Sequence, residues 1–232
     1  MKILGIESSS LVASVALVTD EILTAEYTIN YKKTHSQTLL PMLDEISRML
    51  ELDLHTIDGI AVSGGPGSFT GLRIGSATAK GLGLALKKPL IHVPTVDAMA
   101  YNLWGAEALV CPIMDARRSQ VYTGLYYVMD DLQVEMAQCA MSMETLIQQL
   151  NQRGEKVIFL GDGVPAYVSL IQKEMKVHYA FAPAQSNRQR AASVAALGRI
   201  YMERGQIETA ADHKPEYLRK PQAEREREGI QL

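Results

Sequence analysis

The stretch GGPGSFTGLRIG, from Gly64 to Gly75, follows a short apolar run at residues 57–62 and opens a segment rich in Ala, Gly and Leu. An apolar strand, a glycine-rich turn and a helix in that order are typical of anion sites, because the turn directs backbone N–H groups and the positive helix end at the ligand. The turn has no Gly-Lys-Ser/Thr, so it is not a Walker loop. Thr70 stands where a dinucleotide fingerprint beginning at Gly65 requires glycine, so that motif also fails.

Around this turn the chain repeats one order of elements twice. Apolar periodicity predicts strand, strand, strand, helix, strand, helix and strand in each half. In the first half the segments are 3–6, 12–18, 22–29, 35–50, 57–62, 71–86 and 90–93. In the second half they are 108–114, 121–128, 132–137, 142–152, 157–160, 165–175 and 177–181, followed by a last helix at 191–203. Glu7 matches Asp115, and Gly64 matches Gly161.

This duplication is typical of the α/β ASKHA fold of actin, sugar kinases and Hsp70, with two tandem ribonuclease-H-like domains. We predict a first domain at 1–100 and a second at 101–204. A C-terminal segment at about 205–232 is expected to pack back on the first domain.

Bulk composition excludes several classes of protein. The chain has 232 residues, 47% hydrophobic and 21% charged, which suits a globular protein with a substantial core. The net charge of -3 gives no global electrostatic case for nucleic-acid binding. Two cysteines without close spacing argue against a disulfide scaffold or a cysteine metal site. Without a signal peptide or a run long enough to span a bilayer, we expect a cytoplasmic protein with no membrane contact.

The carboxylates at the matching turns are candidates for a nucleotide cleft. In this architecture they face the space between domains, where they would hold a metal-bound nucleotide, but each would equally serve to cap its own turn. The hydroxyls of the serine turn (residues 8–10) and the two arginines that follow Asp115 complete this set of candidate residues. The candidate cleft comprises Glu7, Ser8, Ser9, Asp115, Arg117 and Arg118. The five histidines form no pair at i,i+3 or i,i+4, so we expect no metal site and assign no catalytic residue.

Two helices of the first half are candidates for a subunit interface. Gly71, Gly75, Ala79 and Gly83 recur at every fourth position, which allows close approach of another element. That element is either the protein's own sheet or a partner, and the helix at 35–50 carries Leu40 beside its main apolar stripe. The candidate interface residues are His35, Leu39, Leu40, Met42, Leu43, Ile46, Arg73, Gly75, Ala79 and Gly83.

Five motifs together resemble the TsaB (YeaZ) family: MKILGIESSS at 1–10, HSQTLLPML at 35–43, the glycine turn, DARRSQVY at 115–122 and PEYLR at 215–219. TsaB is the paralogue of TsaD, which transfers a threonylcarbamoyl group to the adenosine 3′ of the anticodon in tRNAs reading codons that begin with A. TsaD carries a His-x-x-x-His metal pair, and the matching positions here are near Thr95 and Met99, neither a suitable ligand.

The resemblance implies a non-catalytic scaffold subunit that dimerises through the two helices. Its implied partners are a TsaD-like catalytic paralogue, a TsaE-like P-loop ATPase and, through the complex, tRNA. It implies a homodimer when the chain is alone and no cofactor on the isolated chain, with ATP and metal on the partner subunits. The alternatives are an independent ASKHA-type ATPase or small-molecule kinase that uses the cleft, and a tRNA-binding module that uses Arg117, Arg118, Arg219 and Lys220.

Overall fold

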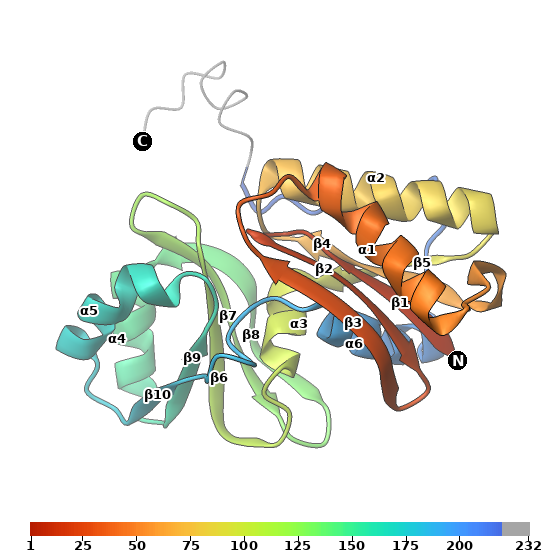
Figure 1. Cartoon of the computed structure of the whole chain (residues 1–232). Helices are drawn as coiled ribbons and strands as arrows, with labels where there is room; N and C mark the ends of the chain where they lie inside the picture. The colour runs from red at the N-terminus through yellow and green to blue at the C-terminus, as the bar shows by residue number, and fades with distance from the viewer. Residues whose placement is uncertain (220–232) are drawn as a thin grey trace.

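The computed structural model describes residues 1–219, and Lys220 and the remaining C-terminal residues of the expected 205–232 segment lie outside the described part. Two five-stranded mixed sheets lie side by side, with strand orders β3-β2-β1-β4-β5 and β10-β9-β6-β7-β8 (Figure 1). Corresponding strands occupy corresponding places in the two sheets, so the predicted duplication and fold class are confirmed.

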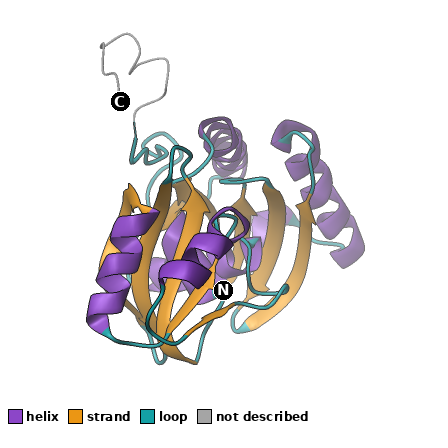
Figure 2. Cartoon of the chain, turned by 90° about the vertical axis from the view of Figure 1, so that its left-hand side faces the viewer, coloured by secondary structure: helices purple, strands orange, loops and turns teal. Residues whose placement is uncertain are grey.

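The first half contains β1 (Lys2–Glu7), β2 (Val12–Thr19), β3 (Ile22–Asn30), α1 (His35–Leu50), a 3₁₀ turn (Leu54–Thr56), β4 (Gly59–Gly65), α2 (Phe69–Leu86) and β5 (Leu90–Pro94). The second half contains β6 (Ala106–Asp115), β7 (Gln120–Val128), β8 (Leu132–Ser142), α4 (Met143–Arg153), β9 (Val157–Leu160), α5 (Val164–Glu174) and β10 (Tyr179–Phe181). Helix α3 (Thr95–Tyr101) connects the two halves, and helix α6 (Ala191–Glu203) follows the second half. Figure 2 shows helices lying against the strands, both on the outer faces of the sheets and between them.

Strand β1 is buried on both faces because helices cover the first sheet from both sides. Alternate residues of a strand point to opposite faces. Leu4 and Ile6 accordingly join the core under α1 and α2, whereas Ile3 joins the core under α6. The second sheet has its own core beneath α4 and α5, built around Phe159.

Helix α6 packs on β1, β2 and β4 of the first sheet, although the predicted second domain, 101–204, includes it. Small residues allow this packing: a Cβ on Gly5 would lie 2.4 Å from the Ala191 carbonyl oxygen, and one on Gly198 would lie 2.5 Å from the Ala61 Cβ. The apolar stripe of α6 indicates burial, but it does not say which sheet receives the helix. The second half therefore contributes a helix to the first sheet.

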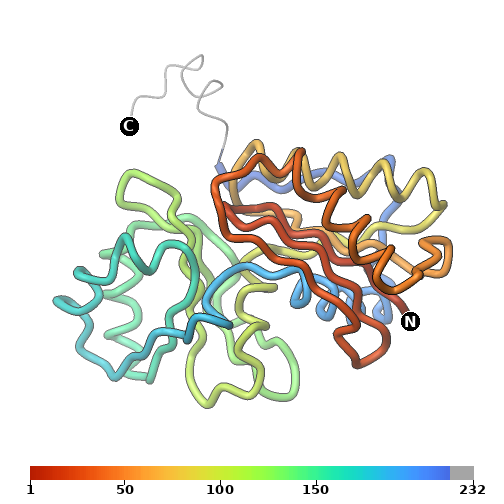
Figure 3. The backbone as a smooth tube through the Cα atoms, in the orientation of Figure 1, coloured from red at the N-terminus to blue at the C-terminus, as the bar shows by residue number. Residues whose placement is uncertain are grey.

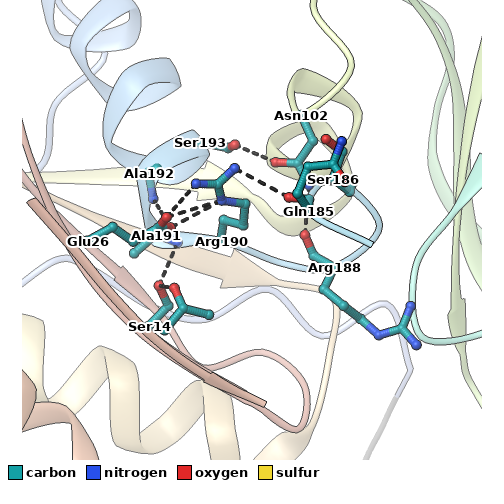
Figure 4. A network of polar contacts seen from close by, with 11 residues as sticks. Ser14, Glu26, Asn102, Gln185, Ser186, Arg188, Arg190, Ala191, Ala192 and Ser193 are labelled. Atoms are coloured by element: carbon teal, nitrogen blue, oxygen red, sulfur yellow. Dashed lines mark hydrogen bonds and ion pairs between the residues drawn. The ribbon is translucent and has the colours of Figure 1, made fainter. Parts of the chain in front are cut away.

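A polar network fixes the return of the chain from the second half into α6 (Figure 4). The Arg190 guanidinium donates to the Glu26 carboxylate at 2.5 Å, and that carboxylate also accepts from the Ala192 amide at 3.2 Å. The Ser14 hydroxyl accepts from the Ala191 amide at 3.1 Å. Strands β2 and β3 thus cap the N-terminus of α6, where free amides need acceptors. On the other side, Asn102 donates to the carbonyls of the 182–190 loop.

The segment after α6 runs beside α2 on the first half (Figure 3). Glu208 pairs with Leu90 through two backbone hydrogen bonds of 2.9 Å, and Ala210 joins the core beneath α2. Farther on, the Glu216 amide donates to Gly64 in the glycine turn at 2.7 Å. The Arg219 guanidinium donates to the Ala116 carbonyl at 2.9 Å, so this segment touches both halves.

Candidate functional site

The glycine turn, the serine turn and the β6–β7 turn surround a cavity of about 660 Å³ between the two halves. Helix α2 points its N-terminus at this cavity. The lining residues are Ser9, Ser10, Leu11, His35, Gly67, Ser68, Phe69, Thr70, Met114, Asp115, Ala116, Arg117, Tyr122 and Asp162. Of the predicted cleft set, Ser9, Asp115 and Arg117 line the cavity, whereas Glu7, Ser8 and Arg118 are not among its walls.

The glycine turn presses directly against the serine turn. A Cβ on Gly67 would lie 2.3 Å from the Ser9 carbonyl oxygen, and one on Gly71 would lie 2.1 Å from that of Ser8. The Ser68 amide donates to the Ser9 carbonyl at 2.6 Å, and the Gly71 amide donates to the Ser68 hydroxyl at 3.3 Å. Two amides that an anion site would use are therefore bonded within the protein.

The Glu7 carboxylate is buried and accepts hydrogen bonds from the amide and hydroxyl of Ser9, at 2.6 Å and 2.5 Å. Burial raises the pKa of Glu7 to about 7, against the lowering effect of its hydrogen bonds from Ser9. Ser8 is also buried, and its hydroxyl donates to the Gly71 carbonyl at 2.9 Å. Of the two roles open to Glu7 and Ser8, the structure favours organisation of the turn over contact with a nucleotide.

The β6–β7 turn that follows Asp115 has a strained backbone. Arg117, Arg118 and Ser119 have φ values of 61°, 55° and 57°, in the left-handed region that side chains rarely adopt. The Asp115 carboxylate accepts from the Arg117 amide at 2.8 Å, so it caps this turn while also facing the cavity. Arg117 faces the cavity, and Arg118 is exposed outside its walls.

Two residues that the sequence analysis left out of the cleft belong to its walls. His35, assigned above to the interface, lines the cavity, and its Nε2 lies 3.0 Å from the Val12 carbonyl. Asp162 lies opposite in the turn after β9, where burial raises its pKa and Gln189 donates to it at 3.1 Å. The match between Gly64 and Gly161 was a signal for Asp162, because it places residue 162 at the turn equivalent to the glycine turn.

Most of the predicted interface residues are buried within the first half, and their role in an interface stays a prediction. These residues lie on the sides of α1 and α2 that face the first sheet. Leu39, Met42, Leu43, Ile46, Gly75, Ala79 and Gly83 are all buried. A Cβ on Gly75 would lie 2.1 Å from the Ser8 hydroxyl, and one on Gly83 would lie 2.4 Å from Leu90 Cδ1. The stripe of small residues therefore fits the protein's own strands.

Leu40 and Arg73 are the predicted interface residues that remain exposed. Leu40 is 53% exposed, Met49 near the end of α1 is 69% exposed, and Leu84 of α2 is 67% exposed. The Arg73 guanidinium stacks 3.8 Å from the centre of the Phe69 ring. Gly81 also faces outward, with open space where its Cβ would be.

Two glycines of α2 should respond oppositely to alanine. Gly71→Ala is expected to cost about 2 kcal/mol of unfolding free energy, because overpacking against backbone outweighs the roughly 1 kcal/mol gained in helix propensity. Gly81→Ala, on the open face of the same helix, should gain about 0.5–1 kcal/mol. Urea denaturation followed by circular dichroism measures both. Equal effects of the two substitutions would contradict the tight fit at Ser8.

Comparison with known proteins places these features in a family. The family model for TsaD, tRNA N6-adenosine threonylcarbamoyltransferase, matches residues 23–227. The tRNA threonylcarbamoyladenosine biosynthesis protein TsaB of Bacillus subtilis is 32% identical over 228 residues, which cover 97% of this chain and 96% of that protein. The chain belongs to the TsaB (YeaZ) family. The Escherichia coli TsaB is also 32% identical, over 73% of this chain and 75% of the relative.

Solved structures agree with TsaB membership. YeaZ from Pseudomonas aeruginosa superposes with a TM-score of 0.79 and 26% identity, covering 93% of this chain and 99% of that one. An inorganic polyphosphate/ATP-glucomannokinase from an Arthrobacter strain gives a TM-score of 0.53 at 10% identity, covering 86% of this chain and 98% of that one, which shows the shared fold alone. Membership in TsaB assigns the chain to the biosynthesis of threonylcarbamoyladenosine in tRNA. Within residues 1–219, no helix is long and apolar enough to cross a membrane.

Proposed function

We propose that this chain is a non-catalytic scaffold subunit that supports threonylcarbamoyl transfer by a TsaD-like paralogue. The observation that carries the proposal is the interior of the cleft: the glycine turn is bonded to the serine turn, and Glu7 is buried behind it rather than exposed to a ligand. At the positions assigned to the metal pair of TsaD, Thr95 and Met99 are fully buried in α3. A thioether is a poor ligand for zinc and for a hard cation, and a hydroxyl is not among the usual protein ligands of zinc.

The surface that we assign to the paralogue is the outer face of α1 and α2, defined by Leu40, Arg73, Gly81 and Leu84. Two large apolar side chains, Leu40 and Leu84, are exposed on this face, and its helices contact one another. Exposed apolar side chains gathered on one face favour an interface. Gly81 adds to this argument, because it weakens the helix without any contact inside the chain that requires a glycine.

The same surface would support a homodimer when the paralogue is absent, because both proteins share the duplicated fold. We further propose that a TsaE-like P-loop ATPase joins the pair. In this assembly ATP and the metal of the transfer reaction are on the partner subunits. Transfer to the adenosine 3′ of the anticodon, in tRNAs reading codons that begin with A, takes place on the TsaD-like subunit.

Reconstitution tests the scaffold role. Unmodified tRNA, threonine, bicarbonate, ATP, the enzyme that makes the activated intermediate, the paralogue and the P-loop ATPase are combined with or without this chain. Nucleoside mass spectrometry should detect the product only when this chain is present together with the paralogue. Product formed by this chain in place of the paralogue would overturn the non-catalytic assignment. Product that does not depend on this chain would overturn the scaffold role.

Charges on the outer face test the interface. Leu40→Glu and Leu84→Glu should each weaken association with the paralogue at least tenfold, because a charge would be buried without a partner. The free energy of unfolding of the isolated chain should stay within about 0.5 kcal/mol, since both side chains are exposed. Met129→Glu is the matched control, because Met129 is 41% exposed in the second half. Surface plasmon resonance measures affinity, and unchanged binding by both variants would exclude this face.

An independent ATPase is the second candidate, and the size and polarity of the cavity favour it. Asp115 and Asp162 are on one wall and the N-terminus of α2 is on the other. This function predicts binding and turnover of ATP–Mg by the isolated chain. Calorimetric titration that gives no heat with ATP–Mg would exclude it and would leave the scaffold proposal standing.

A further inference from the structure

Three side chains with metal-binding atoms meet at the edge of the first sheet, outside the cleft. His92 lies in β5, whereas Glu208 and His213 lie in the segment after α6. One donor atom of each lies within 4.8 Å of the others. The backbone pairing of Glu208 with Leu90, two residues before His92, brings them together. These histidines are far apart in sequence, so a search for neighbouring pairs missed them.

His213 carries an unsatisfied buried nitrogen. The residue is 1% exposed, and its Nδ1 lies 2.5 Å from a carboxylate oxygen of Glu208. Within residues 1–219, its Nε2 has no hydrogen-bond partner. A buried polar atom without a partner costs free energy unless water or an ion satisfies it. The ring of His92 lies 5.9 Å away, centre to centre, so the two imidazoles are neighbours.

The surroundings hold this arrangement in place. A Cβ on Gly64 would lie 2.1 Å from the His92 ring, so the absence of a side chain there makes room for the imidazole. The Lys80 ammonium donates to the carbonyls of Ala211 and His213 at 3.3 Å and 3.1 Å, which fixes the turn that carries His213.

We propose that His92, Glu208 and His213 bind a divalent transition-metal ion, and Zn²⁺ suits this donor set best. Two imidazoles with one carboxylate form a common zinc site, in which a water molecule completes the tetrahedron. His213 would bind the ion through its unpartnered Nε2. Metal–donor distances of about 2.0–2.2 Å require donor atoms that now lie up to 4.8 Å apart to approach by about 1 Å, which side-chain rotation supplies. A cavity of about 390 Å³ borders His92 and Glu208 and provides the route for the ion and the space for the water.

The ion would join β5 to the segment that continues across the glycine turn. That segment contacts Gly64 through Glu216 and the second half through Arg219. The bound ion would therefore hold the C-terminal segment against the first sheet. It differs in position from the Thr95 and Met99 pair, and it replaces the expectation that the isolated chain has no metal site.

Zinc titration of the full chain tests the site. Chelator-treated protein is titrated with Zn²⁺ in competition with a chromogenic chelator. We expect one ion per chain, a higher melting temperature with zinc, and at least tenfold weaker binding in His92→Gln and Glu208→Gln. His92→Gln is the safer variant for folding because His92 is only partly buried. Exposed His55 and His178 supply matched controls, and His55→Gln and His178→Gln should bind like the wild type.

Cobalt gives a second readout, because tetrahedral Co²⁺ absorbs visible light and the absorption should disappear in His213→Gln. Absence of saturable binding in the wild type would overturn the proposal. So would binding that is equally strong in all five variants, which would indicate adventitious surface zinc. Failure of these tests leaves the scaffold function untouched, because that function is measured by product formation and by affinity for the paralogue.

Discussion

Leu39→Glu is expected to lower the free energy of unfolding at 25 °C by more than about 4 kcal/mol. Leu39 is 1% exposed and belongs to the core between α1 and the first sheet. A glutamate there would lose its hydration without gaining a charged partner, and the packing of the leucine would be lost as well. Because a domain typically has a stability of about 5–15 kcal/mol, such a loss removes a large share of it.

Urea denaturation followed by circular dichroism measures this effect, with Leu39→Ala as the milder variant at about 2–5 kcal/mol. Leu40→Glu, at the adjacent position, is the matched control because Leu40 is 53% exposed. Similar stabilities of Leu39→Glu and Leu40→Glu would contradict the orientation of α1. Because of this burial, a charge at Leu39 reports on folding, and the charge at Leu40 reports on the interface.

Glu7→Gln is expected to stabilise the protein above neutral pH by roughly 2–3 kcal/mol. Burial raises the pKa of Glu7 from 4.5 to about 7. Between these values the folded protein keeps a proton that the unfolded chain has lost, so the contribution of Glu7 to stability declines as the pH rises through this window. Glutamine retains an oxygen that accepts from Ser9 and carries no charge, so it removes the decline.

Denaturation at a series of pH values between about 4 and 9 measures the difference between wild type and variant. The difference should be small below the unfolded-state pKa and should grow until the pH exceeds about 7. Glu174→Gln, at a side chain that is 47% exposed, keeps Glu7 and should follow the wild-type profile. A variant less stable than the wild type at high pH would mean that Glu7 is ionised and favourably paired in the folded state.

The local spacing of apolar residues predicted most helices and strands, because a period of 2 residues is typical of strands and a period of 3.6 residues is typical of helices. The repeated order of elements also fixed the fold class, and strand orders in the two sheets match. The glycine turn was found for the same reason: a turn that needs glycine leaves a local trace in the sequence. Candidate cleft residues were found only in part, because adjacent residues such as Ser8 and Ser9 point to different surroundings.

The sequence by itself determined the duplicated α/β fold, the family and the cavity-lining turns. Tertiary structure decided which sheet receives α6, which side chains of α1 and α2 stay exposed, and that His92 meets His213. The spacing of apolar residues shows that one face of a helix or strand must be buried. It does not show which other element covers that face. Contacts between distant segments depend on how whole elements pack, through close approaches such as that of Gly5 to Ala191.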